Sequence, residues 1–304
     1  MVFPGQGSQS QGMQADLAAQ YPIVRETYAE AGELLGYDLW QLVQDGPAEK
    51  LGETIVTQPA MLAAGVAAYR AWQAAGGSDP SQLAGHSLGE YTALVCGGAV
   101  SFSDAMRVVM RRAQLMQDAV PTGVGAMAAV LGLDDESVIK VCEEASLIGI
   151  AEPVNFNSPG QVVLAGHAEA VDRAVDLARD AGARRAIKLA VSVPSHSSLM
   201  IRAGESLSGA LAEVDFHTPV IRVVAATDGT PYVDADDIRS RLSRQVYASV
   251  HWVATVRSII ANGATSIIEC GPGKVLTGLI RRIDKGTAVG FIDNYDSLQK
   301  ALQN

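Results

Sequence analysis

Residues 83–91 read Leu83-Ala84-Gly85-His86-Ser87-Leu88-Gly89-Glu90-Tyr91. A short apolar segment precedes a Gly-x-Ser-x-Gly core, and an Ala- and Leu-rich run follows it as far as Cys96. This order predicts a strand, a tight turn and a helix, the context of a nucleophile elbow. Such a turn exposes the Ser87 hydroxyl beside a helix N-terminus and directs the Leu88 amide at an oxyanion. The alternative is that Ser87 only caps the helix.

The bulk composition is that of a globular protein: 304 residues, 48% apolar and 18% charged, enough for one large domain or a domain with a subdomain. The net charge of −10 argues against a nucleic-acid partner, because phosphates require a basic face. The three cysteines lack metal-type spacing, which predicts buried thiols in a reducing compartment and no metal site. No apolar run reaches the roughly 18 residues of a membrane span. We therefore expect a cytoplasmic protein.

The first residues are apolar and lead into a glycine-containing loop, Pro4-Gly5-Gln6-Gly7-Ser8-Gln9. Strands usually run about five or six residues, so we expect the first strand to begin upstream of Met1. Gln6 and the backbone amides of this loop suit an anion or oxyanion. A solvated polar turn explains the same loop equally well.

Several helices are expected before residue 120, over 13–20, 22–35 and 39–43. A longer apolar helix follows, with Thr57 as its cap, Pro59 in its first turn and its end at residues 76–77. Gln58 at its start is either a functional polar group or a capping residue, and we favour the second interpretation. Another helix begins at Ser101 and carries Arg112 on its apolar face. A guanidinium there either reaches along the surface to solvent or waits for a carboxylate, and we favour the second interpretation.

The pattern changes over residues 123–193. Strands are expected at 126–131, 154–157, 161–165 and 186–191, with helices from Asp134 to residue 145 and over 169–181. The order βαββαβ predicts a ferredoxin-like subdomain inserted into the larger domain, as a lid beside Ser87.

The chain then returns to the large domain, which we assign to residues 1–122 and 194–304. Helices are expected over 199–214, 238–246 and 274–283, and strands over 222–226, 265–269 and 289–292. Alternating strands and helices predict an α/β fold with a mainly parallel sheet.

A nucleophilic serine needs a base, and five histidines are available. His86 adjoins Ser87 on strand-like backbone, so its side chain points the other way. His167 begins a subdomain helix, and His217 and His251 lack a distinctive loop. His196 follows a proline in a Ser-rich turn where the subdomain ends, and by a small margin it is the favoured base.

Six segments occur in an order that closely resembles the malonyl-CoA:acyl carrier protein transacylases of bacterial type II fatty-acid synthesis, and the resemblance covers nearly the whole chain. They are Phe3-Pro4-Gly5-Gln6-Gly7-Ser8-Gln9, Thr57-Gln58-Pro59-Ala60, Gly85-His86-Ser87-Leu88-Gly89-Glu90-Tyr91, Asn155-Phe156-Asn157-Ser158-Pro159-Gly160-Gln161, Val193-Pro194-Ser195-His196 and Glu269-Cys270-Gly271-Pro272-Gly273. The resemblance implies a hydrolase-like α/β core with an inserted ferredoxin-like subdomain, in agreement with the elements above.

The resemblance also implies roles for individual residues. Ser87 becomes the nucleophile, His196 the base and Arg112 the ligand of the malonyl carboxylate. The oxyanion hole is formed by Gln6 and the Leu88 amide. A backbone carbonyl near Gln245 orients the histidine, so no triad aspartate is expected. One departure is Ala248-Ser249, where the family commonly has Asn-Pro, which puts the local loop conformation in doubt.

The implied activity is that of a malonyl-CoA:acyl carrier protein S-malonyltransferase, acting through a malonyl-serine intermediate in ping-pong order without a cofactor. Malonyl-CoA and acyl carrier protein are the implied partners, and a monomer is expected. Alternatives are a serine esterase or thioesterase, a non-catalytic binding module, and a polyketide-type acyltransferase. In an esterase the order Ser, Asp, His is expected, with the histidine late in the chain; His196 stands too early.

The carrier of this pathway is acidic, and so is this chain, so a local basic patch is needed at the mouth of the site. Arg281 and Arg282 lie near the end of the helix expected over 274–283, whose apolar residues Val275, Leu276, Leu279 and Ile283 are expected to face inward. Either the two arginines bind the carrier, or they only compensate the helix dipole.

Overall fold

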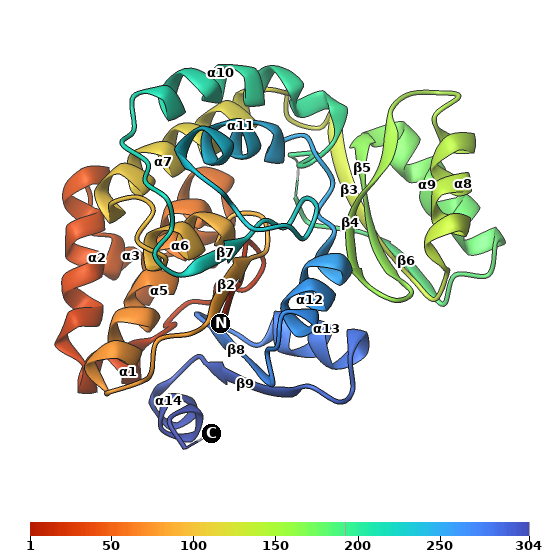
Figure 1. Ribbon diagram of the computed structural model, residues 1–304. Helices are drawn as coiled ribbons and strands as arrows, with labels where there is room; N and C mark the ends of the chain where they lie inside the picture. Colours follow the sequence, from red (N-terminus) through yellow and green to blue (C-terminus); the bar gives the residue numbers. More distant parts are fainter. Residues whose placement is uncertain (192, 304) are drawn as a thin grey trace.

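The computed structural model describes residues 1–191 and 193–303. The expected domain ranges also include residues 192 and 304, which lie outside the described residues. Two sheets organise the chain, one in each part of the molecule seen in Figure 1.

The larger sheet has five parallel strands in the order β7-β2-β1-β8-β9. The strands are β1 (Val2–Phe3), β2 (Gln82–Gly85), β7 (Arg222–Val224), β8 (Ser266–Cys270) and β9 (Ala288–Ile292). Side chains alternate between its faces: Phe3 and Leu83 pack into one hydrophobic cluster, and Val2 and Ala84 into another. Helices therefore cover both faces, as a buried parallel sheet requires.

The described residues of this part of the chain form twelve α-helices. They are α1 (Ala15–Gln20), α2 (Pro22–Leu35), α3 (Leu39–Asp45), α4 (Ala48–Gly52), α5 (Thr54–Ala74), α6 (Gly89–Cys96), α7 (Phe102–Asp118), α10 (Ile201–Ala212), α11 (Ala235–Gln245), α12 (Trp252–Ala261), α13 (Val275–Ile283) and α14 (Tyr295–Ala301). A single 3₁₀ turn, Ser198–Met200, precedes α10. Helix α5 is buried along most of its length, as its apolar sequence predicts.

The start of α5 differs from the prediction. The helix begins at Thr54, three residues before the expected cap, and Pro59 lies inside it. Thr57 is not a cap: its hydroxyl donates to the carbonyl oxygens of Leu51 and Glu53 at 2.5 and 3.0 Å. This earlier turn is stabilised by burial of Val56, which outweighs the hydrogen bond that Pro59 cannot donate.

The smaller sheet is antiparallel, in the order β4-β5-β3-β6. Its strands are β3 (Gly125–Leu131), β4 (Ala151–Ser158), β5 (Gln161–His167) and β6 (Arg185–Lys188), and helices α8 (Asp135–Ala145) and α9 (Ala168–Asp180) cover one face. This βαββαβ topology confirms the predicted ferredoxin-like unit within an α/β fold.

The other face of the smaller sheet turns toward the large part of the molecule (Figure 1). Strand β4 is joined to the loop before α12, because the Phe156 amide donates to the Val250 carbonyl at 2.9 Å and the Val250 amide to the Val154 carbonyl at 2.8 Å. Met127 and Val163, on β3 and β5, line a cavity between the two sheets. This cavity contains Ser87 and His196.

Candidate active site

Ser87 occupies the turn between β2 and α6. Its φ of 51° is in the left-handed region, which a serine rarely adopts. The flanking glycines allow the close packing of this turn: a Cβ on Gly85 would lie 1.9 Å from the Gly89 carbonyl carbon, and one on Gly89 would lie 2.2 Å from the Phe3 carbonyl oxygen. The geometry is that of a nucleophile elbow, as the sequence predicts.

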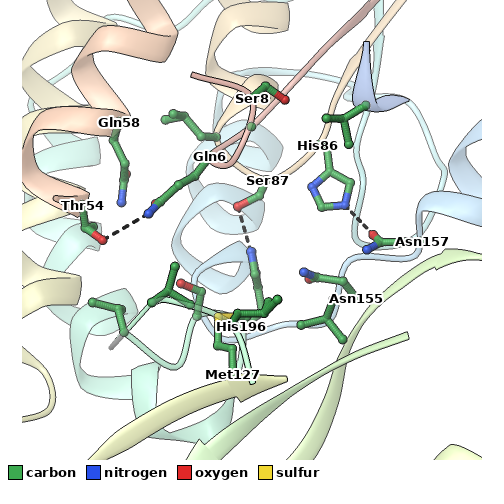
Figure 2. A pocket seen from close by; sticks show the side chains of 18 of the residues that line it. Gln6, Ser8, Thr54, Gln58, His86, Ser87, Met127, Asn155, Asn157 and His196 are labelled. Carbon is green, nitrogen blue, oxygen red and sulfur yellow. Dashed lines mark hydrogen bonds between the residues drawn. The ribbon is translucent and has the colours of Figure 1, made fainter. Parts of the chain in front are cut away.

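His196 reaches Ser87 from the opposite side of the cavity. Its Nε2 lies 2.7 Å from Ser87 Oγ (Figure 2). Its Nδ1 lies 2.8 Å from the Gln245 carbonyl oxygen and 3.1 Å from that of Ala248. A carbonyl accepts only, so Nδ1 carries the hydrogen and Nε2 is free to accept the Ser87 proton.

His196 is uncharged in this environment. Burial lowers the pKa of its imidazole to about 3, and the positive charge of Arg112 acts in the same direction. The side chain is 4% exposed. A neutral imidazole that accepts from a serine hydroxyl has the protonation state of a general base.

The other histidines lie elsewhere. His86 also lines the cavity, but its Nε2 lies 2.8 Å from Asn157 Oδ1 (Figure 2), and the histidine that contacts Ser87 Oγ is His196. His167 accepts from the Ile150 amide, His217 lies beside Asp215, and His251 stacks on Phe156.

Arg112 is buried within the cavity wall on α7, with 2% of its surface exposed. Its guanidinium donates to Gln58 Oε1 at 2.6 Å, to Gln245 Oε1 at 3.1 Å and to Ser87 Oγ at 3.2 Å. Among the described residues, no carboxylate forms an ion pair with it, and its Nε has no partner. A buried guanidinium without a carboxylate in contact is ready to bind one from a ligand.

Gln58 is therefore misassigned by the sequence analysis. Instead of capping a helix, it lies within α5 and its side chain contacts Arg112 and the Met116 sulfur. The error follows from placing the N-cap of α5 at Thr57, four residues after the observed N-cap Glu53. The sequence held one signal of a functional role for Gln58: it lies in Thr57-Gln58-Pro59-Ala60, one of the six segments that carry the family resemblance.

The two residues expected at the oxyanion hole both line the cavity. Leu88 immediately precedes α6, and its amide donates to no group within the described part of the chain. Gln6 lies in the loop after β1, where its side chain approaches Thr54 Oγ1 at 3.5 Å (Figure 2). An amide beside the nucleophile and near a helix N-terminus suits a developing negative charge.

Two asparagines were quoted in the sequence without a role and prove to line the cavity. Asn155 and Asn157 alternate along β4, so both side chains point to the same side of the strand (Figure 2). Asn155 Oδ1 is buried without a hydrogen-bond partner among the described residues. The period-two spacing is the signal that could have identified them.

Arg281 and Arg282 are both exposed at the end of α13. Arg282 donates to Gln161 Oε1 at 2.6 Å, across to the smaller sheet. The inward face of α13 is partly different from the expected one: Leu276, Leu279 and Ile280 are buried, but Val275 is 50% exposed and lines the cavity. Because Lys274 adopts non-helical backbone before α13, Val275 begins the helix at the mouth of the cavity.

The remaining expectations concern metals, thiols and membranes. No cluster of three or more His, Cys, Asp or Glu residues in the described part of the chain is placed to bind a metal ion. Cys142 and Cys270 are buried, and Cys96 is half-buried. Within residues 1–191 and 193–303 no helix has both the length and the apolarity needed to span a membrane.

Comparison with known proteins gives a consistent result. Residues 1–287 match the family model described as acyl transferase domain. The chain is 53% identical over 302 residues to the malonyl CoA-acyl carrier protein transacylase of Escherichia coli strain K12, covering 99% of this chain and 98% of the relative. The Bacillus subtilis enzyme of the same name is 40% identical over 306 residues, covering 99% of this chain and 95% of the relative.

Two solved structures are similar to this chain over its whole length. A malonyl-transacylase in complex with a type II polyketide acyl carrier protein has a TM-score of 0.98 at 52% identity, covering 100% of this chain and 98% of that one. The malonyl CoA-acyl carrier protein transacylase from Coxiella burnetii has a TM-score of 0.98 at 45% identity, covering 100% and 96%.

Proposed function

This chain belongs to the acyl transferase domain family, and from that premise we propose that it moves a malonyl group from coenzyme A to the phosphopantetheine thiol of acyl carrier protein in fatty-acid synthesis. The observation that carries the proposal is the position of Arg112. Its buried guanidinium, which no carboxylate of the described residues pairs with, lies 3.2 Å from the same Ser87 oxygen that His196 approaches. A substrate held there by a carboxylate presents its acyl carbon to the nucleophile.

The first half-reaction forms a malonyl-serine ester. His196 Nε2 takes the Ser87 proton while Oγ attacks the thioester carbonyl, whose oxygen becomes an oxyanion stabilised by backbone amides at Gln6 and Leu88. Collapse of the tetrahedral intermediate breaks the carbon–sulfur bond. The departing thiolate takes the proton from His196, giving free coenzyme A.

The second half-reaction reverses these steps with a different thiol. The phosphopantetheine thiol of the carrier gives its proton to His196 and attacks the ester, and Ser87 Oγ leaves and takes that proton back. Nucleophile, base and oxyanion donors account for every bond made and broken, so we infer that no cofactor takes part. Every group in the proposed site comes from one chain, and we propose a monomer acting in the cytoplasm.

Arg112 also provides a basis for selecting malonyl over acetyl groups. A malonyl carboxylate pairs with the buried guanidinium, whereas an acetyl group leaves that charge unpaired in a desolvated cavity. The discrimination is therefore expected from a polar group that the wrong substrate fails to satisfy.

We propose that Arg281 and Arg282 contact the acidic carrier. Two observations support this: both arginines are exposed, and the helix that carries them starts at Val275 on the wall of the cavity. A carrier bound over α13 has a short path for its phosphopantetheine arm to Ser87. Because the polyketide carrier complex belongs to a similar enzyme, a polyketide carrier is the second candidate acceptor.

Intact-protein mass spectrometry after brief mixing with malonyl-CoA tests the function. The wild type gains one malonyl group and Ser87→Ala gains none. The control Ser103→Ala, at a half-buried serine that does not line the cavity, is labelled like the wild type. Adding holo-carrier then moves the group to the carrier. Stoichiometric labelling of Ser87→Ala would refute the assigned nucleophile, and a stable label that fatty-acid carrier cannot remove but polyketide carrier can would favour the second acceptor.

A further inference from the structure

Gln245, the last residue of α11, contacts both functional halves of the site. Its backbone carbonyl accepts the Nδ1 hydrogen of His196 at 2.8 Å. Its side-chain Oε1 accepts from Arg112 Nη2 at 3.1 Å. Gln245 is fully buried, so the direction of its amide matters: the oxygen must face Arg112 for that hydrogen bond to form.

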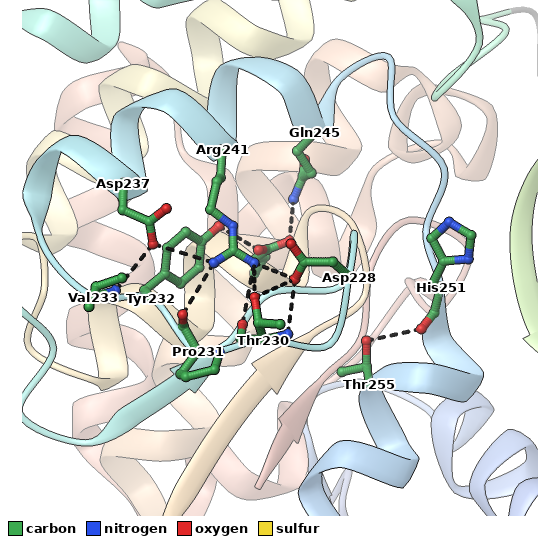
Figure 3. A network of polar contacts seen from close by, with 11 residues as sticks. Asp228, Thr230, Pro231, Tyr232, Val233, Asp237, Arg241, Gln245, His251 and Thr255 are labelled. Carbon is green, nitrogen blue, oxygen red and sulfur yellow. Dashed lines mark hydrogen bonds and ion pairs between the residues drawn. The ribbon is translucent and has the colours of Figure 1, made fainter.

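The amide direction is fixed by two acceptors. Gln245 Nε2 donates to the Ser87 carbonyl at 2.8 Å and to Glu90 Oε2 at 2.7 Å. Both amide hydrogens are thus used on oxygens that accept (Figure 3 shows Gln245 within this network). If the amide were reversed, its oxygen would face two acceptors and its NH₂ group would face a guanidinium donor.

Glu90 is held in turn from its other side. It lies in the first turn of α6, is completely buried, and its Oε1 accepts from the Tyr232 hydroxyl at 2.5 Å. Burial raises the pKa of Tyr232 well above its ordinary value, so the hydroxyl is protonated and donates. The Ala226 backbone amide also donates to this side chain. A buried carboxyl group whose two oxygens accept from different donors has a single preferred orientation.

Tyr232 is supported by a charged residue nearer the surface. The guanidinium of Arg241 lies over the tyrosine ring, 4.8 Å from its centre, and forms ion pairs with Asp228 and Asp237 (Figure 3). Hydrogen bonds and ring packing thus connect Arg241, through Tyr232, Glu90 and Gln245, to Arg112.

We propose that Glu90 is a positioning residue: by accepting from Gln245 Nε2 it sets the direction of the Gln245 amide and holds Arg112 ready for the malonyl carboxylate. Tyr232 holds Glu90 for this purpose. The inference rests on the proposed malonyl transfer, in which Glu90 touches neither substrate nor reacting atoms. The proposal concerns selection among acyl groups and not the base. The Gln245 side chain contacts Arg112, whereas His196 is contacted by the Gln245 backbone carbonyl, whose direction does not depend on Glu90.

The experiment measures kcat/KM for malonyl-CoA and for acetyl-CoA with the same carrier and takes their ratio. In Glu90→Ala the Gln245 amide loses one of its two acceptors and keeps only the Ser87 carbonyl, so its oxygen holds Arg112 less firmly. The malonyl-to-acetyl ratio therefore falls about fivefold or more, the effect of one hydrogen bond of ordinary strength. Tyr232→Phe lowers the ratio in the same direction by about twofold to fivefold.

Glu90→Gln separates hydrogen bonding from charge. Its amide oxygen accepts from Gln245, and its NH₂ group donates to the Tyr232 hydroxyl, which then accepts. The ratio in Glu90→Gln therefore stays within about twofold of the wild-type ratio. A ratio as low as that of Glu90→Ala would show that Glu90 acts through its negative charge and not by orienting Gln245, and would overturn the proposal.

Two further variants test the route. Tyr28→Phe removes another buried tyrosine hydroxyl, one that contacts Gln14 Oε1 at 3.1 Å outside the cavity, and leaves the ratio unchanged. Gln245→Leu keeps the backbone carbonyl and lowers the ratio as Glu90→Ala does, and in that background Glu90→Ala lowers it no further.

Other outcomes also overturn the inference: parallel losses for malonyl and acetyl in Glu90→Ala and Tyr232→Phe, or an undiminished effect of Glu90→Ala in the Gln245→Leu background. As a readout independent of turnover, calorimetry in a Ser87→Ala background compares the Kd of malonyl-CoA with and without Glu90→Ala, and an unchanged Kd contradicts the proposal. A wild-type protein that forms no malonyl-enzyme refutes the proposed function itself, whereas normal wild-type transfer with an unchanged ratio refutes only the role of Glu90.

Discussion

Replacing Arg112 by methionine tests the proposed carboxylate site most directly. Methionine keeps much of the length of arginine and fills an apolar gap adaptably, so the cavity is preserved while the charge and all five N–H donors are removed. The contacts to Gln58, Gln245 and Ser87 are lost together.

The magnitude follows from what a malonyl carboxylate gains at this place. A guanidinium pairs with a carboxylate through two parallel hydrogen bonds, and bonds to charged groups contribute about 1.5–3 kcal/mol each. Two such bonds amount to about 3–6 kcal/mol, or roughly 10²–10⁴-fold in kcat/KM for malonyl-CoA. Acetyl-CoA makes neither bond, so its kcat/KM stays within about fivefold of the wild-type value or rises as an unpaired buried charge disappears.

The assay measures initial rates of transfer to holo-carrier with both thioesters, on wild type and Arg112→Met. Arg70→Met serves as a matched control, because Arg70 on α5 pairs with Glu30 on α2 and does not line the cavity. This variant leaves both rates near wild type. Equal losses for malonyl and acetyl in Arg112→Met would refute the carboxylate site and identify a structural arginine.

Three further predictions concern the base, its pH dependence and the carrier. His196→Ala lowers malonyl transfer by about 10²–10⁴-fold, the usual contribution of a positioned base; a comparable loss in His86→Ala or His251→Ala alone, with His196→Ala active, would refute the assignment. Burial lowers the pKa of His196 to about 3, so the base stays unprotonated as the pH falls. The rate of Ser87 acylation is therefore constant from about pH 7.5 to about pH 5.5. A midpoint in this rate near the ordinary histidine pKa of about 6.5 would contradict the prediction. The double variant Arg281→Glu with Arg282→Glu raises the KM for carrier and weakens its salt dependence while transfer to free pantetheine hardly changes; a parallel fall of both reactions would place the docking surface elsewhere.

The features predicted well are those that short stretches of sequence determine. The Gly-x-Ser-x-Gly turn requires close packing at Gly85 and Gly89, and the structure has it. The helices expected to begin at Asp134 and at Ser101 do begin there, and both side chains prove to be N-caps. A side-chain oxygen before an apolar run accepts a backbone amide almost independently of the rest of the fold. The succession of strands and helices along the subdomain is likewise determined by local apolar alternation and by turn residues.

The features predicted poorly depend on tertiary contacts. Helix α5 starts early because Val56 packs into the core, and Gln58 then faces Arg112; no local signal distinguishes this from a cap at Thr57. Helices α4, α12 and α14 were not predicted. Val275 belongs to the apolar stripe of α13 but lines the cavity. Helical periodicity predicts which residues share a face of a helix, but not what that face packs against.

The pairing of Ser87 with His196 lies between these cases. The sequence favoured His196 by its place at the end of the inserted subdomain, and the family resemblance gave it the role of the base. The two residues are 109 positions apart, and their 2.7 Å contact depends on how both sheets are assembled. Spacing alone could not give that distance.

Within residues 1–191 and 193–303, His196 Nδ1 contacts backbone carbonyls and no aspartate, and the position of Gln245 gives a reason. Gln245 accepts hydrogen bonds from two residues of the site: its backbone carbonyl from His196 Nδ1, and its side-chain oxygen from the Arg112 guanidinium. An aspartate in this position would orient the histidine equally well, but it would also lie within reach of Arg112 and form an ion pair with it. The carboxylate of a substrate would then have to compete with a carboxylate of the protein. In the proposed mechanism, the backbone oxygen of Gln245 orients the base and its side-chain oxygen holds Arg112. Because both acceptors are neutral, the buried positive charge is left for the carboxylate of the substrate.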